Sequence, residues 1–435
     1  MARKQKFAAV ALMTVLAIVA AACGSSKSKP AASGSPSTST KASGGRGNVN
    51  GQLVIGGLLP QSGDLSAVVK SFETPVKMAV AEINAAGGVN GKPVVLKEAD
   101  DGTSADVASS SLDTLLTSDK VDAIVGPASS GTALGIIDKV KTNGVVECSG
   151  SNTSGELSVA GGAAGGYYFR TAPSDKLQGP ALAQLILQDN KHKVAILTRN
   201  DSYGTGFGAS LSKALKDGGA DVLVNAAYDP KGTDFKADVA KVAGKGADAI
   251  VVIGFNDDGG KIVKEMIAQN LGPKQVQIYT ADGMQGSSFY KGVDPANPAV
   301  VQGIKGTAPA AAPSGVTSPF IAAFKATGID SIFSSYYYDC TILIALAAQA
   351  AASDDPAKIR DKMVEVSSGG TKCQTFKACS DLLKAGTDIN YEGASGPVDL
   401  TATHEPNVGV YDVWAYDAKG APTNITGIAQ IKINA

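Results

Sequence analysis

Two clusters of small hydroxyl residues stand out in the stretch 121–153 (VDAIVGPASSGTALGIIDKVKTNGVVECSGSNT). Each follows an apolar, β-branched run: Ser129 and Ser130 after the first, Ser151 and Thr153 after the second. Helical spacing between the two runs predicts strand, helix, strand. The hydroxyls would then meet at adjacent strand ends, where α/β sheets bind ligands, and the N–H groups that open the helix would favour a small carboxylate. The simpler alternative is that the first two serines only cap the helix.

Other chemistry has weaker support. The segment YGTGFGA, with Gly204 and Gly206, imitates a dinucleotide-binding turn. However, residues 199–203 separate it from the preceding apolar run, and their bulk would keep a pyrophosphate away. His192 and His404 stand in unrelated surroundings, so they indicate neither a metal site nor a catalytic triad. We therefore expect a protein that is not an enzyme and needs no metal or cofactor.

The amino terminus has the pattern of an export signal. Basic residues at positions 3, 4 and 6 precede the apolar run Phe7 to Ala22, which is too short to span a bilayer and ends at Cys23. This segment resembles a bacterial lipoprotein signal, which implies that Cys23 is acylated and becomes the new amino terminus. An ordinary secretory signal is the alternative. We expect residues 1–22 to be the signal peptide and residues 23–50 a flexible tether, holding the body at the outer face of the cell membrane.

The chain beyond residue 50 has the length and charge of a two-lobed body. Nearly 385 residues are too many for one ordinary core but suit two lobes. A net charge of −1, with 18% charged residues, gives no basic stripe, so nucleic acid is not an expected partner. The apolar run 341–352 is too short to span a membrane and is expected to be a buried helix, so the lipid anchor would be the one attachment to the membrane.

Four cysteines remain after the lipidation site. Outside the cytoplasm an even number favours disulfides. Cys373 and Cys379 are the first expected pair, because they lie six residues apart in a polar segment and could close a short loop. Cys148 in an apolar strand and Cys340 in an apolar helix are either a second pair or buried free thiols.

Strands and helices alternate through the body in two successive sets. This predicts an α/β fold of two Rossmann-like lobes, each a mostly parallel sheet with helices on both faces. The expected strands are 52–60, 92–98, 121–125 and 145–148 in the first lobe, and 193–198, 221–227, 247–255 and 275–279 in the second. A further extended run covers 301–312, helices 319–326 and 338–352 follow, and GPVDL and GVYDVWAYD near the end alternate like an antiparallel pair.

This order of elements divides the chain. The expected parts are lobe 1 at 51–172, lobe 2 at 173–305, a return to lobe 1 at 306–390, and C-terminal strands of lobe 2 at 391–435. Several crossings between the lobes make a multi-stranded hinge. Such a hinge lets two lobes close on a ligand held between them.

Six segments resemble one protein family in the same order along the chain: LLPQSGDLS, EINAAGGVNGKPV, VGPASSGTA, CSGSNTS, YYFRTAPSD and DSYGTG. They resemble the solute-binding proteins of branched-chain amino acid ABC transporters, which have the type I periplasmic-binding fold. The likeness runs from Gly51 almost to the end and is greatest to actinobacterial lipoprotein members, which also carry a low-complexity tether. The resemblance implies an extracytoplasmic protein that passes a small ligand to permease subunits.

The resemblance also implies which residues hold the ligand. In this family hydroxyl residues after the third and fourth strands hold the substrate carboxylate, an acid in the second lobe meets the ammonium group, and aromatic side chains line the pocket. The expected ligand-binding residues here are Ser129, Ser130, Ser151, Thr153, Tyr203, Phe255, Asn256 and Asp282. Asn256 replaces the aromatic residue that is common in the family, which leaves the recognised side chain open.

Hydroxyls on one lobe and a carboxylate on the other fit the two ends of a zwitterion. Hydrogen bonds to charged groups contribute roughly 1.5 to 3 kcal/mol each, and a micromolar site needs about 8 kcal/mol, so a few such bonds plus apolar burial suffice. We therefore expect a neutral or branched-chain amino acid as the ligand and an ABC permease as the partner. Alternatively, the same closing lobes signal to a membrane receptor.

Two of these assignments have structural alternatives. Taken alone, an Asp at a strand end, such as Asp282, is more often a turn or cap residue, and Tyr203 is equally typical of a packing residue above a helix. The tyrosines at 336–338 are expected in the core rather than at the ligand.

Overall fold

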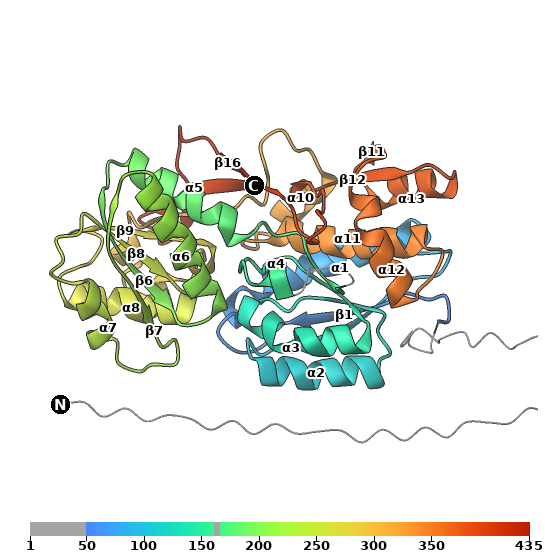
Figure 1. The fold of residues 1–435 in the computed structure, drawn as a ribbon, viewed down its shortest axis with the longest axis horizontal. Helices are drawn as coiled ribbons and strands as arrows, with labels where there is room; N and C mark the ends of the chain where they lie inside the picture. Colours follow the sequence, from blue (N-terminus) through green and yellow to red (C-terminus); the bar gives the residue numbers. More distant parts are fainter. Residues whose placement is uncertain (1–48, 161–165) are drawn as a thin grey trace, which may run out of the picture. The chain divides into compact units, whose positions relative to one another are not determined.

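Lobe 1 is built on a sheet of five parallel strands. The computed structural model describes residues 49–160 and 166–435, which belong to one compact unit. The strands lie in the order β2-β1-β3-β4-β5, and every neighbouring pair is parallel (Figure 1). Their bounds are β1 (Val54–Leu59), β2 (Val95–Asp100), β3 (Ala123–Val125), β4 (Val146–Ser149) and β5 (Tyr168–Arg170). The first four lie within a few residues of the expected strands, whereas β5 was not predicted.

Helices cover both faces of this sheet. One face packs against α2 and α3, and the other against α1 and α11, which joins from late in the chain. In Figure 1 the orange α11 accordingly lies beside the blue α1. The helices of lobe 1 are α1 (Val69–Ala85), α2 (Ala105–Thr117), α3 (Ser130–Asn143), α4 (Leu157–Ala160), α11 (Ser334–Ala350), α12 (Pro356–Met363) and α13 (Phe376–Lys384).

Lobe 2 is built on a mixed eight-stranded sheet. The order is β15-β14-β10-β9-β8-β6-β7, with β16 also paired to β14. The strands from β6 to β10 are parallel, and β14 is antiparallel to its three partners. The bounds are β6 (Lys193–Arg199), β7 (Asp221–Tyr228), β8 (Ala249–Ile253), β9 (Gln277–Thr280), β10 (Lys305–Pro309), β14 (Val408–Tyr416), β15 (Pro422–Asn424) and β16 (Ile431–Asn434).

Two helices of lobe 2, α6 and α8, begin at side-chain caps. The Asp201 side chain accepts a hydrogen bond from the Gly204 N–H at 2.8 Å, which starts α6, and Asp258 accepts one from the Phe255 N–H at 3.1 Å, which starts α8. Strand β8 (AIVVI) is buried throughout, as expected when helices cover both faces of a parallel sheet. The helices are α5 (Asp175–Gln188), α6 (Ser202–Asp217), α7 (Lys236–Val242), α8 (Asn256–Ala268) and α9 (Tyr290–Val293).

The chain passes between the two sheets three times: after β5, after β10, and before β14. These crossings form the expected multi-stranded hinge. The remaining elements are a small third sheet, one helix and four short 3-10 turns: β11 (Thr371–Cys373), β12 (Ile389–Gly393), β13 (Gly396–Pro397), α10 (Pro319–Lys325), η1 (Ser66–Val68), η2 (Asp282–Met284), η3 (Pro298–Val301) and η4 (Glu365–Ser367).

Two expectations about the late part of the chain were wrong. GPVDL and GVYDVWAYD do not pair with each other: β13 pairs with β12, whereas β14 lies between β10 and the last two strands. The free edge of β10 and the C-terminal strands give β14 partners on both sides. The division of the chain also shifts by a few residues, because β10 belongs to the lobe 2 sheet through Pro309 and residues 391–397 belong to the third sheet.

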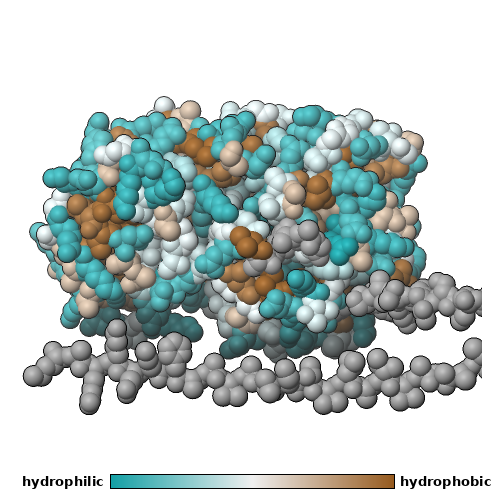
Figure 2. Space-filling view, in the orientation of Figure 1, coloured by the Kyte–Doolittle hydropathy of each residue, from teal (hydrophilic) through white to brown (hydrophobic). Residues whose placement is uncertain are grey.

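The face of the molecule seen in Figure 2 is largely hydrophilic. In the view of Figure 2, hydrophobic residues form small separate groups among hydrophilic ones. Among the described residues, no helix combines the length and apolar character needed to cross a membrane. The expected signal peptide, Cys23 and the tether up to residue 48 lie outside the described residues.

Candidate functional site

A pocket lies between the two lobes at the carboxyl ends of their parallel strands; we call it the interlobe pocket. The structure brings all eight expected ligand-binding residues to its lining. Lobe 1 contributes the four hydroxyl residues, and lobe 2 contributes the aromatic, amide and acidic ones: Ser129, Ser130, Ser151, Thr153, Tyr203, Phe255, Asn256 and Asp282.

The lobe 1 side joins the loops after β3 and β4. Ser130 is the first residue of α3, and its Oγ accepts hydrogen bonds from the N–H groups of Thr153 and Ser154, both at 3.2 Å. Because these bonds use the lone pairs of Ser130 Oγ, its O–H proton is left to donate to a ligand. Arg170, at the end of β5, fixes the second loop by donating to the carbonyls of Asn152 at 3.2 Å and Ser154 at 2.8 Å.

A glycine sets the path into α3. Gly126 has φ +111°, and a Cβ added there would lie 2.0 Å from the Leu58 carbonyl oxygen, so no other residue fits without a backbone shift. At the start of the helix, Ser129 makes no side-chain capping bond. The first-turn N–H groups of α3 have no partner within the helix, so together with the Ser130 hydroxyl they are the kind of donors that an anion needs. The alternative that Ser129 and Ser130 only cap the helix therefore does not hold, because Ser129 makes no capping bond and Ser130 Oγ bonds the loop after β4.

Ser151 is held differently from Ser130. Its Oγ donates to the Ala128 carbonyl at 2.8 Å and lies 2.7 Å from the Tyr337 hydroxyl. Since Ser151 has one proton, Tyr337 must donate in this pair. The Ser151 side chain is therefore engaged within lobe 1, and its backbone N–H also donates to Ser149 Oγ at 3.3 Å.

Asp282 supplies the negative charge of lobe 2. Its Oδ1 accepts from the Gln178 amide at 2.8 Å and from the Tyr203 hydroxyl at 3.4 Å, and the residue is 4% exposed. Burial raises the pKa of the Asp282 carboxyl to about 6, although the hydrogen bonds from Gln178 and Tyr203 act in the opposite direction. A cationic group nearby would restore the charged form.

An aromatic stack stands beside this acid. The rings of Tyr203 and Phe255 are stacked with centroids 5.5 Å apart, and the Tyr203 hydroxyl also accepts from the Gly283 N–H at 3.2 Å. Tyr203 thus packs and also positions Asp282. Asn256 Oδ1 is buried without a hydrogen-bond partner among the described residues, which leaves an acceptor for a ligand.

Sequence reasoning missed a second buried acid. Asp175, the first residue of α5, is 1% exposed, and its carboxyl oxygens have no hydrogen-bond partner in the part of the chain that the structure describes. Burial, and to a smaller extent the charge of Asp282, raise the pKa of Asp175 well above its usual value. Its N–H donates to the Thr153 carbonyl at 2.7 Å, so this acid lies directly behind the lobe 1 loop. The position of Asp175 at the end of YYFRTAPSD, shortly after a strand, could have indicated that it lies near the ligand-binding edge of the sheet.

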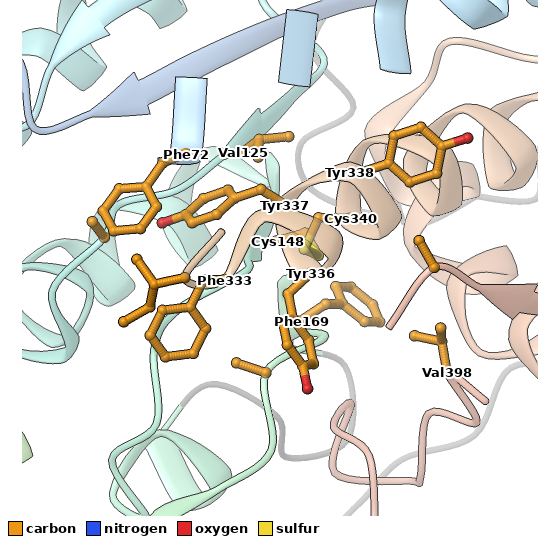
Figure 3. Packing of buried hydrophobic residues seen from close by; sticks show 14 of the residues in the cluster. Phe72, Val125, Cys148, Phe169, Phe333, Tyr336, Tyr337, Tyr338, Cys340 and Val398 are labelled. Atoms are coloured by element: carbon orange, nitrogen blue, oxygen red, sulfur yellow. A yellow bond between two sulfur atoms is a disulfide. The ribbon is translucent and has the colours of Figure 1, made fainter. Parts of the chain in front are cut away.

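Sequence reasoning also missed an apolar wall of the pocket. It comes from the segment after β1 and from the chain before α11: Leu65, Val68, Phe72, Ile332 and Phe333. Figure 3 shows Phe72 and Phe333 near Tyr337, and the rings of Phe72 and Tyr337 lie 4.9 Å apart. Phe333, which precedes α11, has φ +56°, a backbone conformation that is rare for a bulky residue. The position of Leu65, Val68 and Phe72 after the first strand could have indicated that they lie near the pocket. Nothing in the sequence around Phe333 indicates that it does.

The described cysteines form two disulfides. Cys148 bonds with Cys340 and Cys373 with Cys379. The first bond, visible in Figure 3, ties Cys148 in β4 to Cys340 in α11, and Cys148 lies three residues before Ser151. The alternative of free thiols does not hold for this pair. All three tyrosines at 336–338 are buried, as expected.

Comparisons with known proteins agree with this geometry. A family model described as "Periplasmic binding protein" matches residues 52–420. The chain is 27% identical over 364 residues to the chemotactic signal transduction system substrate-binding protein BasB of Halobacterium salinarum, across 82% of this chain and 85% of that protein. It is 28% identical over 241 residues to the Leu/Ile/Val-binding protein BraC3 of Rhizobium johnstonii, across 55% and 63%.

A solved structure gives the same result for the fold. The branched-chain amino acid transporter substrate binding protein LivJ of Streptococcus pneumoniae, in complex with isoleucine, is 25% identical and superposes with a TM-score of 0.70. The match covers 88% of this chain and 99% of LivJ. The expected two-lobed α/β fold is confirmed.

Proposed function

The chain belongs to the periplasmic binding protein family that its residues 52–420 match, and on that premise we propose that it captures a neutral amino acid in the interlobe pocket and delivers it to an ABC permease. Its family and fold are those of extracytoplasmic proteins that bind small ligands, not of enzymes. Our proposal adds that the ligand is a neutral amino acid and that the receiving partner is an ABC permease.

One observation carries the proposal: the pocket has two poles on opposite lobes. The start of α3 and the Ser130 hydroxyl offer donors to a carboxylate, whereas the buried Asp282 carboxyl favours a cation. An α-amino acid carries both charges on one carbon atom. Because neither lobe alone holds both groups, closure of the lobes is what completes the site.

The apolar wall supports a neutral side chain. Leu65, Val68 and Ile332 are aliphatic, and Phe72 and Phe333 add two ring surfaces. Burying one aliphatic side chain against such a wall contributes about 1.5 to 3 kcal/mol. Together with hydrogen bonds to two charged groups, at about 1.5 to 3 kcal/mol each, this is of the order that a micromolar site needs. The isoleucine bound to the related LivJ is of this chemical class.

Calorimetric titration of the mature protein with the proteinogenic amino acids at neutral pH tests the ligand assignment. We expect micromolar binding of at least one neutral, aliphatic member. Two analogues of that ligand serve as controls, since the amide removes the carboxylate and the hydroxy acid removes the ammonium group, and each should bind at least tenfold more weakly. If no proteinogenic amino acid binds, the ligand assignment is wrong although the fold stands.

A sensing function is the second candidate. It is favoured by the likeness to BasB, whose name assigns it to a chemotactic signal transduction system. In that case the closed lobes contact a membrane receptor instead of a permease. Genes for a permease and an ATPase beside this one would favour transport, and a receptor gene there would favour sensing.

A further inference from the structure

An ion pair joins the two lobes at the edge of the interlobe pocket. Arg199, the last residue of β6 in lobe 2, places Nη2 3.3 Å from Oδ2 of Asp64, which lies in the loop after β1 in lobe 1. A second polar contact between the lobes lies nearby, where Ser154 Oγ donates to the Ser202 carbonyl at 3.0 Å. Both contacts require the lobes to be close together.

Lobe 2 holds Arg199 rigidly in this position. Its Nε bonds Asp201 Oδ2 at 2.6 Å, its Nη1 bonds Asp258 Oδ1 at 2.8 Å, and its side chain is 5% exposed. The guanidinium also lies over the ring of Phe255, 3.7 Å from the centroid. By contrast, the Asp64 side chain is 42% exposed. The arginine is therefore a fixed, preorganised donor, and Asp64 is the partner that arrives when the lobes close.

The same arginine connects to the ligand side of the pocket. Its stacking partner Phe255 is stacked on Tyr203, whose hydroxyl donates to Asp282. A continuous set of contacts thus runs from Asp64 through Arg199 to Asp282, the acid assigned to the ligand's positive end.

We propose that Asp64 and Arg199 are positioning residues that hold the lobes shut around the bound ligand. This inference rests on the proposed function for its effect on ligand release, whereas the pair itself favours the closed conformation with or without a ligand. The pair forms in the closed state, so it stabilises the complex against opening and has little influence on the encounter of ligand with the open form. Its effect therefore falls on the dissociation rate constant and leaves the association rate constant unchanged.

Substitution of Asp64 isolates this pair, because Arg199 keeps its partners within lobe 2. For Asp64→Asn, stopped-flow measurement with the ligand found by calorimetry should show a dissociation rate about threefold to tenfold higher, with association unchanged. The difference from the wild type should shrink in 1 M NaCl, since salt screens a partly exposed pair. The matched control is Asp106→Asn, which removes the same charge from an exposed site on α2 in lobe 1.

The charge-reversed variant Asp64→Lys tests the Asp64–Arg199 pair without any ligand. Small-angle X-ray scattering should give a larger radius of gyration for Asp64→Lys than for Asp106→Lys, because like charges would then face each other across the gap. This readout separates the two hypotheses. A wild type that binds no amino acid refutes the proposed ligand, whereas the scattering comparison still tests whether the Asp64–Arg199 pair holds the lobes together. Dissociation rates and radii equal to those of the Asp106 variants would overturn the inference.

Discussion

Replacing Asp282 by Asn removes the negative charge of lobe 2 while keeping the shape of the side chain. Its Oδ1 accepts from Gln178 and Tyr203, and an amide oxygen can accept the same two bonds. The local structure should therefore persist. What disappears is the carboxylate that would face the ammonium group of an amino acid.

The expected loss of affinity follows from the burial of this group, which is 4% exposed. Truncating one partner of a buried, hydrogen-bonded charge pair costs about 2 to 5 kcal/mol, because the other charge is left without compensation. At 1.4 kcal/mol per tenfold change, this corresponds to roughly 30-fold to several-thousand-fold weaker binding. A micromolar wild-type dissociation constant would become tens of micromolar at the least and could reach millimolar.

The pH dependence of binding tests the same group in the wild type. Burial raises the pKa of Asp282 to about 6 in the free protein, and a bound ammonium group favours the ionised carboxylate and so lowers that pKa in the complex. Affinity contributed by this charge is therefore fully present above pH 6 and is lost as the pH falls below it. One pH unit below the free-state pKa, binding should weaken by about tenfold.

Calorimetric titrations of the wild type and Asp282→Asn between pH 5 and pH 8 would measure both effects. The variant should bind weakly and with little dependence on pH over this range. An unchanged dissociation constant for Asp282→Asn at pH 8 would refute the reasoning. If Asp175→Asn weakens binding instead, the buried acid behind the lobe 1 loop holds the positive end of the ligand.

The remaining predictions concern the cysteines. The Cys148–Cys340 bond closes a sequence separation of 192 residues and the Cys373–Cys379 bond one of 6, so loop entropy gives them about 5 and about 2 kcal/mol of stability. Calorimetric melting of the two double-alanine variants should show the larger fall in Tm for the first pair, and an equal fall would contradict this. We also propose that Cys23 carries the lipid anchor: in cell fractionation, Cys23→Ser should move the protein out of the membrane fraction, and retention there would exclude the anchor.

The architecture and most residues of the candidate site could be predicted from the sequence. Alternating apolar strands and helical segments predict parallel sheets, because period and burial are local properties of the chain. Ser130 and Thr153 lie in the short loops after β3 and β4, so their meeting at one edge of the sheet also follows from local order. Asp282 and Tyr203 were placed by resemblance of their segments to the family.

Tertiary structure alone decided the contacts between distant segments. Phe72 and Phe333 meet at the pocket although they lie far apart in the sequence, because the chain returns to lobe 1 after building most of lobe 2. The pairing of Asp64 with Arg199 likewise depends on how the two lobes approach each other. No periodic pattern encodes such contacts, since they arise from the packing of whole elements and not from the residues beside them in the chain. The partners of β14 were mispredicted for the same reason.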